Sequence, residues 1–210
     1  MTAAQVDTGP LHRSTATGGR RIGVLLACLG VIGWLASFQL TVEHWNVLKN
    51  PGYEPGCNIS PVVGCGSVIS GWQGNLLGFP NTLLGLGAFA AVTALGAVLM
   101  TGGRLHRSLW LALNAATLAG VVMAHWLIQQ SLYELGRLCP YCAVVWVVTI
   151  ALFWYVTLHS LKHGVIPVTG RGRAVVSALS VSHWIVLLTW YGTIVFFVLV
   201  RFWSYWTTLI

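Results

Sequence analysis

Five long apolar stretches decide which folds this chain can adopt. A helix needs roughly 20 apolar residues to cross the hydrocarbon core of a bilayer, because each residue advances it by about 1.5 Å. Hydrophobic residues make up 56% of the 210 residues and charged residues only 7%, whereas soluble domains carry about 25% charged residues. The sequence therefore predicts an all-α integral membrane protein with five transmembrane helices, at Ile22–His44, Pro80–Met100, Ser108–Glu134, Cys139–Ser160 and Leu179–Phe202.

The segments between and before these stretches are short. Residues 1–21 are polar and rich in Gly, Thr and Ser, which predicts a disordered tail. Residues 161–178 form a basic loop, and residues 179–210 contain the fifth helix and a short tail. The first apolar stretch is too long for a signal peptide and has no small-residue cleavage site before Val42–Trp45, so we expect a helix that stays in the membrane.

The basic residues are distributed unequally between the two sides of the predicted bundle. Cytoplasmic segments of membrane proteins carry an excess of Lys and Arg, which predicts a cytoplasmic N-terminus in the inner (plasma) membrane. The net charge of +7 then sets topology and does not indicate nucleic-acid binding. The 11 tryptophans fit the aromatic belt of a bilayer protein. The inner segments hold Arg13, Arg20, Arg21, Arg104, Arg107, Lys162, Arg171 and Arg173, and the outer segments hold Lys49, Arg137 and Arg201.

The largest outer segment joins the first two spans, over residues 45–79. Residues 50–56 are rich in Pro and Gly and should be irregular. Gly66–Leu77 carries apolar residues at helical spacing, which predicts a short amphipathic helix at the membrane surface. Cys57 therefore lies in the mobile half of this loop, and Cys65 lies at the start of the anchored half.

Four of the five cysteines form two pairs on the outer side of this topology. Cys57 and Cys65 lie in the loop, and Cys139-Pro140-Tyr141-Cys142 opens the fourth span. A helix N-terminus favours the thiolate, which is the reactive form of cysteine. The outer side of a bacterial membrane is oxidising, so disulfides persist there. Two dithiols on that side indicate an electron relay, whereas Cys28 in the first span is expected to be a buried apolar residue.

Other roles are open for these residues. Cys57 and Cys65 alone would make a structural staple of the loop. A zinc site of four cysteines usually shows Cys-x₂₋₄-Cys in both halves, which the eight-residue step from Cys57 to Cys65 does not, so no metal site is expected.

The histidines raise a further possibility, since two membrane histidines can ligate a haem. The topology places no two of them clearly at one depth. His125 is the one mid-membrane histidine, and we expect it to be hydrogen-bonded within the bundle. The histidines in or beside spans are His44, His125, His159 and His183.

Three motifs together resemble the vitamin K epoxide reductase family. They are the Cys57 to Cys65-Gly66-Ser67 pair, the sequence Phe-Pro-Asn-Thr-Leu-Leu-Gly over residues 79–85, and Cys139-Pro140-Tyr141-Cys142. The resemblance covers residues 22–160, and the fifth stretch matches the fifth helix of bacterial members. It is nearest to the single-domain actinobacterial type, which lacks a fused thioredoxin-like domain. DsbB-type oxidases carry the two kinds of cysteine pair in the opposite order.

The resemblance implies a four-helix bundle around a quinone, with a fifth helix beside it. By this resemblance Cys142 is the cysteine nearest the quinone and Cys139 is its exchange partner. Cys65 passes electrons to Cys139, and Cys57 meets the redox partner.

The resemblance also implies the residues that contact the quinone. Asn81 matches a position that hydrogen-bonds a quinone carbonyl, although it is also a candidate N-cap of the second span. Trp146 stands where mammalian members have a tyrosine, and its indole N–H is a possible second donor. The implied wall residues are Ile69, Leu84, Ile128 and Leu132.

These features predict a quinone-dependent thiol–disulfide oxidoreductase. We expect it to oxidise a separate, secreted thioredoxin-fold (DsbA-like) protein and to reduce a membrane quinone, with menaquinone as the expected one. Two alternatives are a vitamin K epoxide or quinone reductase proper and a non-enzymatic membrane scaffold with one structural disulfide.

Overall fold

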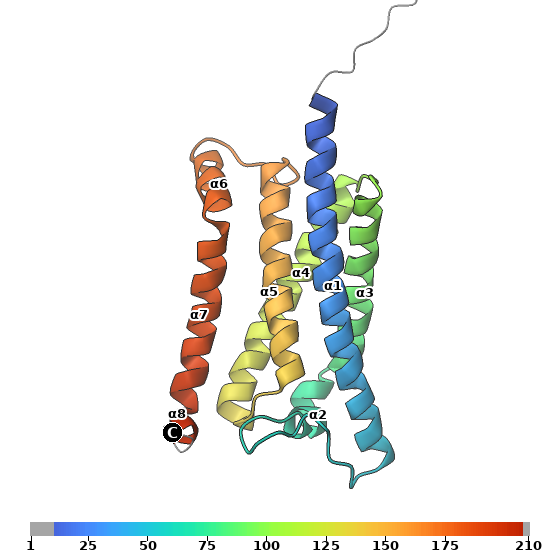
Figure 1. Ribbon diagram of the computed structural model, residues 1–210, viewed down its shortest axis with the longest axis vertical. Coiled ribbons are helices and arrows are strands. Elements are labelled where there is room, and N and C mark those ends of the chain that lie inside the picture. Colours follow the sequence, from blue (N-terminus) through green and yellow to red (C-terminus); the bar gives the residue numbers. More distant parts are fainter. Residues whose placement is uncertain (1–10, 208–210) are drawn as a thin grey trace, which may run out of the picture.

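Five helices of the computed structural model are long and apolar enough to cross a membrane (Figure 1), which confirms the predicted all-α membrane fold. The structure describes residues 11–207, and within this range the chain forms helices and loops with no β-strand beyond one isolated bridge. The spanning helices are α1 (Leu11–Lys49), α3 (Asn81–Met100), α4 (Arg107–Gln129), α5 (Pro140–Lys162) and α7 (His183–Arg201).

Four of these helices form a bundle, and α7 lies beside it (Figure 1). Helix α1 packs against α3 and α5, and α5 also packs against α4. Two hydrogen bonds attach α7: the Trp190 indole N–H donates to His125 Nε2 (2.9 Å), and the Tyr191 hydroxyl donates to the Val147 carbonyl (2.9 Å). His125 Nδ1 lies 2.9 Å from the Val121 carbonyl oxygen. His125 is thus hydrogen-bonded within the helices, as predicted.

Glycines let α1 and α3 approach each other closely. A Cβ on Gly96 would lie 2.5 Å from the backbone nitrogen of Ala27, and one on Gly23 would lie 2.9 Å from the backbone nitrogen of Met100. Small residues at such positions allow membrane helices to pack backbone against backbone. This contact fixes α1, whose C-terminal half carries several residues of the site described below.

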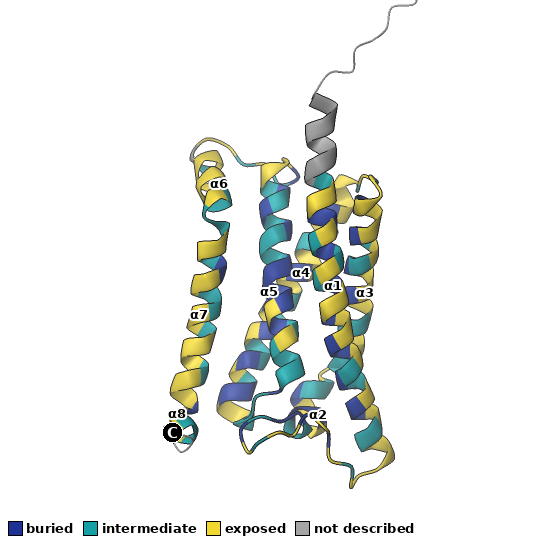
Figure 2. Cartoon of the chain, in the orientation of Figure 1, coloured by how far each residue is buried: buried dark blue, intermediate teal, exposed yellow. Residues whose placement is uncertain are grey.

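The outward faces of the helices are apolar and exposed. Val122, Leu188 and Phe196 are each more than 60% exposed. Figure 2 shows exposed residues along α7 and the outer side of α3, and buried residues on α5. In lipid, apolar side chains on a helix meet an apolar solvent while the backbone groups bond within the helix. The chain is therefore a multi-pass membrane protein.

The segment between α1 and α3 differs from its prediction in continuity. In place of one amphipathic helix over Gly66–Leu77, it forms a short helix α2 (Gly66–Ser70) and a 3₁₀ turn η1 (Trp72–Asn75). Gly71 separates them with an extended backbone (φ −76°, ψ 152°), which fits the poor helix propensity of glycine. Val68 and Ile69 of α2 are buried, as an amphipathic helix requires.

The N-terminal boundary also differs from its prediction. Helix α1 begins at Leu11, so the helix includes residues 11–21 of the expected disordered tail. No proline interrupts the chain between Pro10 and Pro51, and proline is the residue that most strongly stops a helix. The rest of the expected tail lies outside the described residues.

The C-terminal boundaries differ in a similar way. The expected loop over residues 161–178 contains most of α6 (Arg171–Val181), and the last span begins after Ser182 and not at Leu179. A short helix α8 (Trp203–Thr207) follows α7. Hydropathy does not resolve these boundaries, because Leu179 and its neighbours are small or apolar on both sides of the break.

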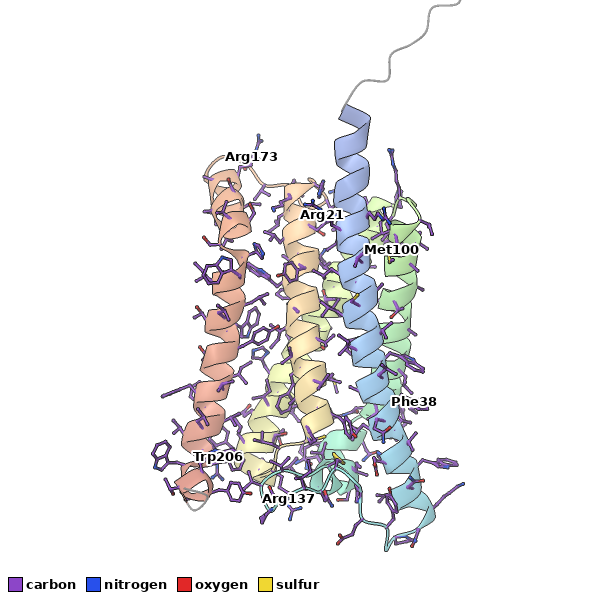
Figure 3. All side chains as sticks on the ribbon, viewed as in Figure 1. Arg21, Phe38, Met100, Arg137, Arg173 and Trp206 are labelled. Carbon is purple, nitrogen blue, oxygen red and sulfur yellow. A yellow bond between two sulfur atoms is a disulfide. The ribbon has the colours of Figure 1, made fainter. Side chains whose placement is uncertain are left out.

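The cysteine-bearing loop lies at one end of the bundle. Arg21 and Arg173 mark the opposite end, and Arg137 and Trp206 lie at the end with the loop (Figure 3). At this end α4 continues into a π-helical turn η2 (Gln130–Leu135) that stops at Gly136. Gly136 has a φ of +60°, a left-handed conformation that glycine adopts without strain. This turn directs the chain from α4 into the start of α5.

Candidate functional site

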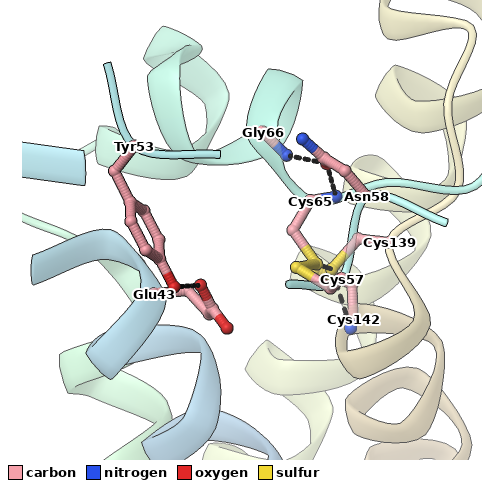
Figure 4. Close-up of a disulfide and its surroundings, with 8 residues drawn as sticks. All are labelled: Glu43, Tyr53, Cys57, Asn58, Cys65, Gly66, Cys139 and Cys142. Carbon is pink, nitrogen blue, oxygen red and sulfur yellow. Dashed lines mark hydrogen bonds between the residues drawn. A yellow bond between two sulfur atoms is a disulfide. The ribbon is translucent and has the colours of Figure 1, made fainter. Parts of the chain in front are cut away.

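Sulfur atoms from both cysteine pairs meet at this end of the bundle (Figure 4). Cys57 and Cys65 form a disulfide. The Cys139 thiol lies 3.3 Å from the Cys65 sulfur, toward which it donates a hydrogen bond. A free thiol therefore touches a disulfide sulfur, and this contact is what thiol–disulfide exchange requires.

A short backbone bridge holds the two pairs together. The Leu138 N–H donates to the Val62 carbonyl (2.8 Å), and the Gly64 N–H donates to the Leu138 carbonyl (3.0 Å). These bonds form a parallel β-bridge between Val63 and Leu138. The cysteines that touch follow this bridge directly in both segments, so backbone hydrogen bonds set their separation.

The start of α5 prepares Cys139 for reaction. Cys139 is the N-cap of the helix, and its sulfur accepts the Cys142 N–H at 3.4 Å. Pro140 follows at the first helical position, where its missing N–H is not needed. A hydrogen bond from the Cys142 side chain and bonds from backbone N–H groups lower the pKa of the Cys139 thiol, although burial opposes them. A lower pKa favours the thiolate that attacks a disulfide.

The cysteines differ in burial. Cys65 and Cys139 are fully buried, and Cys57 is only 4% exposed. Cys57, which the sequence places in the mobile half of the loop, is buried in this state, because the disulfide holds it in the apolar cluster around Cys65. Cys142 is half-buried. Cys28 is exposed on the outward side of α1, which corrects its expected burial.

Two side chains fix the loop around the disulfide. Asn58 Oδ1 accepts the backbone N–H groups of Cys65 and Gly66, each at 3.1 Å. The Tyr53 hydroxyl donates to Glu43 Oε2 at 3.0 Å, which ties the loop to a buried carboxylate of α1 (Figure 4). The loop is therefore held on both sides of Cys57.

Loss of the Asn58 amide should slow exchange between the pairs. Asn58→Ala removes two hydrogen bonds worth about 1 kcal/mol each, so we expect the Cys65–Cys139 bridge to form up to about 30-fold more slowly. The measurement is the rate of this bridge in protein with Cys57 and Cys142 replaced by alanine. Asn58→Asp keeps the accepting oxygen and should keep the rate. An unchanged rate in Asn58→Ala would contradict the positioning role.

A cavity lies beside the inner pair. Its wall is mostly apolar with a few polar side chains, as is usual for small-molecule sites. Residues from α1, the loop, α3, α4 and α5 contribute to it. The lining residues are Ser37, Leu40, His44, Val68, Ile69, Gln73, Gly74, Asn81, Thr82, Gly85, Leu127, Ser131, Leu135, Cys142, Val145 and Trp146.

The cavity includes only some of the residues that the sequence implied for it. Ile69, Asn81 and Trp146 line it together with Cys142. The implied wall residues Leu84, Ile128 and Leu132 do not line it. Leu84 is 41% exposed on α3.

Helical phase explains why Ile128 and Leu132 lie outside the cavity wall. Along α4 and its continuation η2, the cavity row is Leu127, Ser131 and Leu135. Ile128 and Leu132 each come one residue later, which rotates them by about 100° around the helix. They pack instead in an apolar cluster that also contains Trp146. An error of one residue in aligning a helix with its family therefore assigns residues of a neighbouring face to the cavity.

The polar groups of the cavity are compatible with a ligand that carries oxygen atoms. Asn81 Oδ1 accepts the Leu76 N–H (3.2 Å) and its Nδ2 donates to the Gln73 carbonyl (2.7 Å), which leaves one amide N–H. Its alternative as N-cap is wrong, since Pro80 holds that position. The Thr82 hydroxyl is buried and has no partner among the described residues. These groups fit hydrogen bonds to a quinone carbonyl.

Several residues that line the cavity were not predicted from the sequence as parts of a site. They share one signal, because each is a polar side chain within or beside an apolar span, and such residues usually face an interior. The missed polar residues are Ser37, His44, Gln73, Thr82 and Ser131.

Comparison with protein-family models matches residues 24–157 to the vitamin K epoxide reductase family. The matched range contains all four paired cysteines and most of α1 and α5, and it ends before α7. No curated protein sequence matches the chain.

Proposed function

Because the chain belongs to the vitamin K epoxide reductase family, we propose that it carries electrons from a secreted thioredoxin-fold protein, through its two cysteine pairs, to a quinone. Family membership and the five spans make it a membrane oxidoreductase. The donor, the acceptor and the direction of transfer are the proposal.

The contact between Cys139 and Cys65 is the observation that supports it most. A structural staple needs no free thiol against its sulfur, whereas a relay does. The 3.3 Å contact between the Cys139 and Cys65 sulfur atoms lets a bond form between them as the Cys57–Cys65 bond breaks, or the reverse. The outer pair forms a disulfide and the inner thiols are free; in the proposed direction, this combination follows transfer of electrons from the outer to the inner pair.

Each transfer conserves two electrons. A partner dithiol reduces the Cys57–Cys65 disulfide and becomes a disulfide itself. The Cys65 thiolate then attacks Cys139 of an oxidised inner pair and releases Cys142. Attack of the Cys57 thiolate on Cys65 frees Cys139 and restores the outer disulfide. The electrons and two protons then lie on the thiols of Cys139 and Cys142.

The cavity residues would hold the quinone next to the inner pair. When bound, the quinone accepts two electrons and two protons, so the inner thiols can become a disulfide again. Cys142 lies in the cavity wall, Trp146 and Ile69 provide apolar surface, and Asn81 and Thr82 have hydrogen-bonding capacity left. We propose menaquinone as the quinone of the membrane pool.

Charge supports a cytoplasmic N-terminus. The end with Arg21 and Arg173 carries most of the basic residues, and the cysteine end carries Arg137 (Figure 3). Since cytoplasmic segments are the more basic, this orientation places both cysteine pairs on the outer side of the plasma membrane. Secreted proteins form their disulfides on that side.

A folded thioredoxin-like partner should be the preferred electron donor. Cys57 is 4% exposed and lies in a loop held by hydrogen bonds. A folded partner whose surface is complementary to this loop can bring its cysteine to Cys57, whereas an unfolded chain has no such surface. Purified protein with a quinone should oxidise a reduced thioredoxin-fold protein at least about tenfold faster than a reduced unfolded protein of equal thiol content. Equal rates would show direct action on unfolded clients, and no quinone-dependent oxidation of either would refute the proposed function.

A further inference from the structure

His44 is a buried ionisable side chain in the wall of the cavity that holds Cys142. It is 6% exposed and lies on the same face of α1 as Ser37 and Leu40, which also line the cavity. No hydrogen bond to its ring is present within the described part of the chain, although both ring nitrogens of an imidazole are polar. The ring therefore has hydrogen-bonding capacity left for the contents of the cavity.

The surroundings of His44 contain few other groups that can carry a proton. Cys142 is the other ionisable side chain in the cavity wall. Helix α3 has no ionisable residue, and neither α2 nor η1 has one. On α5, Tyr141 lies in the cluster around the disulfide. At the same end of the bundle, Glu43 accepts the Tyr53 hydroxyl and Cys57 is in its disulfide, while Cys139 is the second inner thiol. Glu54 of the loop and Tyr133 and Glu134 of η2 are exposed.

The two protons that a quinone takes up are held by the inner thiols, but they must reach two separate oxygen atoms. A para-quinone has carbonyl oxygens on opposite edges of its ring, and both must receive a proton. The two thiols lie together at the start of α5, so they approach the ring from one side. A group elsewhere in the wall can carry a proton to the far oxygen, and His44 is contributed to the wall by a different helix, α1.

On the basis of the proposed function, we propose that His44 is a catalytic residue that takes a proton from the inner thiol pair and delivers it to a quinone carbonyl. The neutral ring accepts the proton at one nitrogen and has one to give at the other. Two S–H bonds break, the Cys139–Cys142 bond forms, and two O–H bonds form. His44 ends neutral, and no proton is exchanged with solution.

Single-turnover kinetics test this role. Reduced protein is mixed with a saturating short-chain naphthoquinone between pH 5 and 9, and quinone loss is followed by absorbance. The wild-type rate should rise with pH as the imidazole loses its proton. His44→Gln should be about 100-fold slower at pH 8, the usual scale of general acid–base catalysis, and should lack this rise. His44→Asn should behave in the same way.

The quinone affinity of the variant distinguishes a role of His44 in proton transfer from a role in binding the quinone. The oxidised protein has no relay thiol to react, so its quinone affinity can be measured by tryptophan fluorescence, and His44→Gln should bind within threefold of wild type. His125→Gln, a histidine outside the cavity, should keep the wild-type pH profile. An unchanged rate in His44→Gln, a retained pH rise, or a loss of affinity equal to the loss of rate would overturn the proposal. Wild-type protein that no quinone oxidises at any pH would instead refute the proposed function.

Discussion

Replacement of either inner cysteine, as Cys139→Ala or Cys142→Ala, is expected to abolish quinone-dependent oxidation of the thiol partner. Cys139 is the thiol in contact with the Cys65 sulfur, and Cys142 is the cysteine in the cavity wall. Without Cys139 no exchange reaches the inner pair, and without Cys142 no inner disulfide can form. Activity is measured as disulfide formation in a secreted reporter protein in cells whose own pathway is removed.

Cys28→Ala is the matched control for these replacements. Cys28 lies on the outward side of α1, away from the four other cysteines, and its replacement should leave activity unchanged. Membrane levels of each variant are compared by immunoblot, so that loss of activity is not confused with loss of protein. Full activity in Cys139→Ala or Cys142→Ala would refute the relay.

A protein with Cys57→Ala and Cys142→Ala together is expected to convert almost completely to a Cys65–Cys139 disulfide on mild oxidation. Only Cys65 and Cys139 remain of the four, and their sulfur atoms lie 3.3 Å apart in a buried, bridged segment. The bond is identified by mass spectrometry of peptides under non-reducing conditions. Persistence of two free thiols would show that this contact is not a route of exchange.

The same approach assigns the outer cysteine that receives electrons. Cys65→Ala leaves Cys57 without its resolving thiol, so a mixed disulfide between Cys57 and the partner should accumulate. Cys65 is fully buried and Cys57 is 4% exposed, which makes Cys57 the nearer to solvent. A partner linked to Cys65 in Cys57→Ala protein, with none linked to Cys57 in Cys65→Ala protein, would reverse the assignment.

The membrane fold could be predicted from the sequence, because the cost of burying polar groups in lipid imposes long apolar stretches that composition alone reveals. The two cysteine pairs and their order along the chain could also be identified from the sequence. Helix ends were less so: α1 extends to Leu11, and a break at Ser182 separates α6 from α7. Both depend on local backbone choices that hydropathy does not encode.

The details of the site could be predicted only in part. Ile69, Asn81 and Trp146, which the resemblance implied as quinone contacts, line the cavity, but the wall along α4 and η2 is formed by Leu127 and its helical neighbours, one residue away from Ile128. Membrane helices are apolar on most faces, so the sequence gives little information on which face is inward. The bridge between Val63 and Leu138 joins segments 75 residues apart, and no local sequence pattern predicts a contact over such a separation.

The Val63–Leu138 bridge has a kinetic consequence. It makes exchange between the two pairs unimolecular, with a local thiol concentration that no small thiol in solution approaches. Cys139 is also fully buried beneath the disulfide loop, so soluble thiols have no path to it. In the proposed relay, the inner pair is thereby shielded, and external reductants would reach the quinone only by way of Cys57 and its loop.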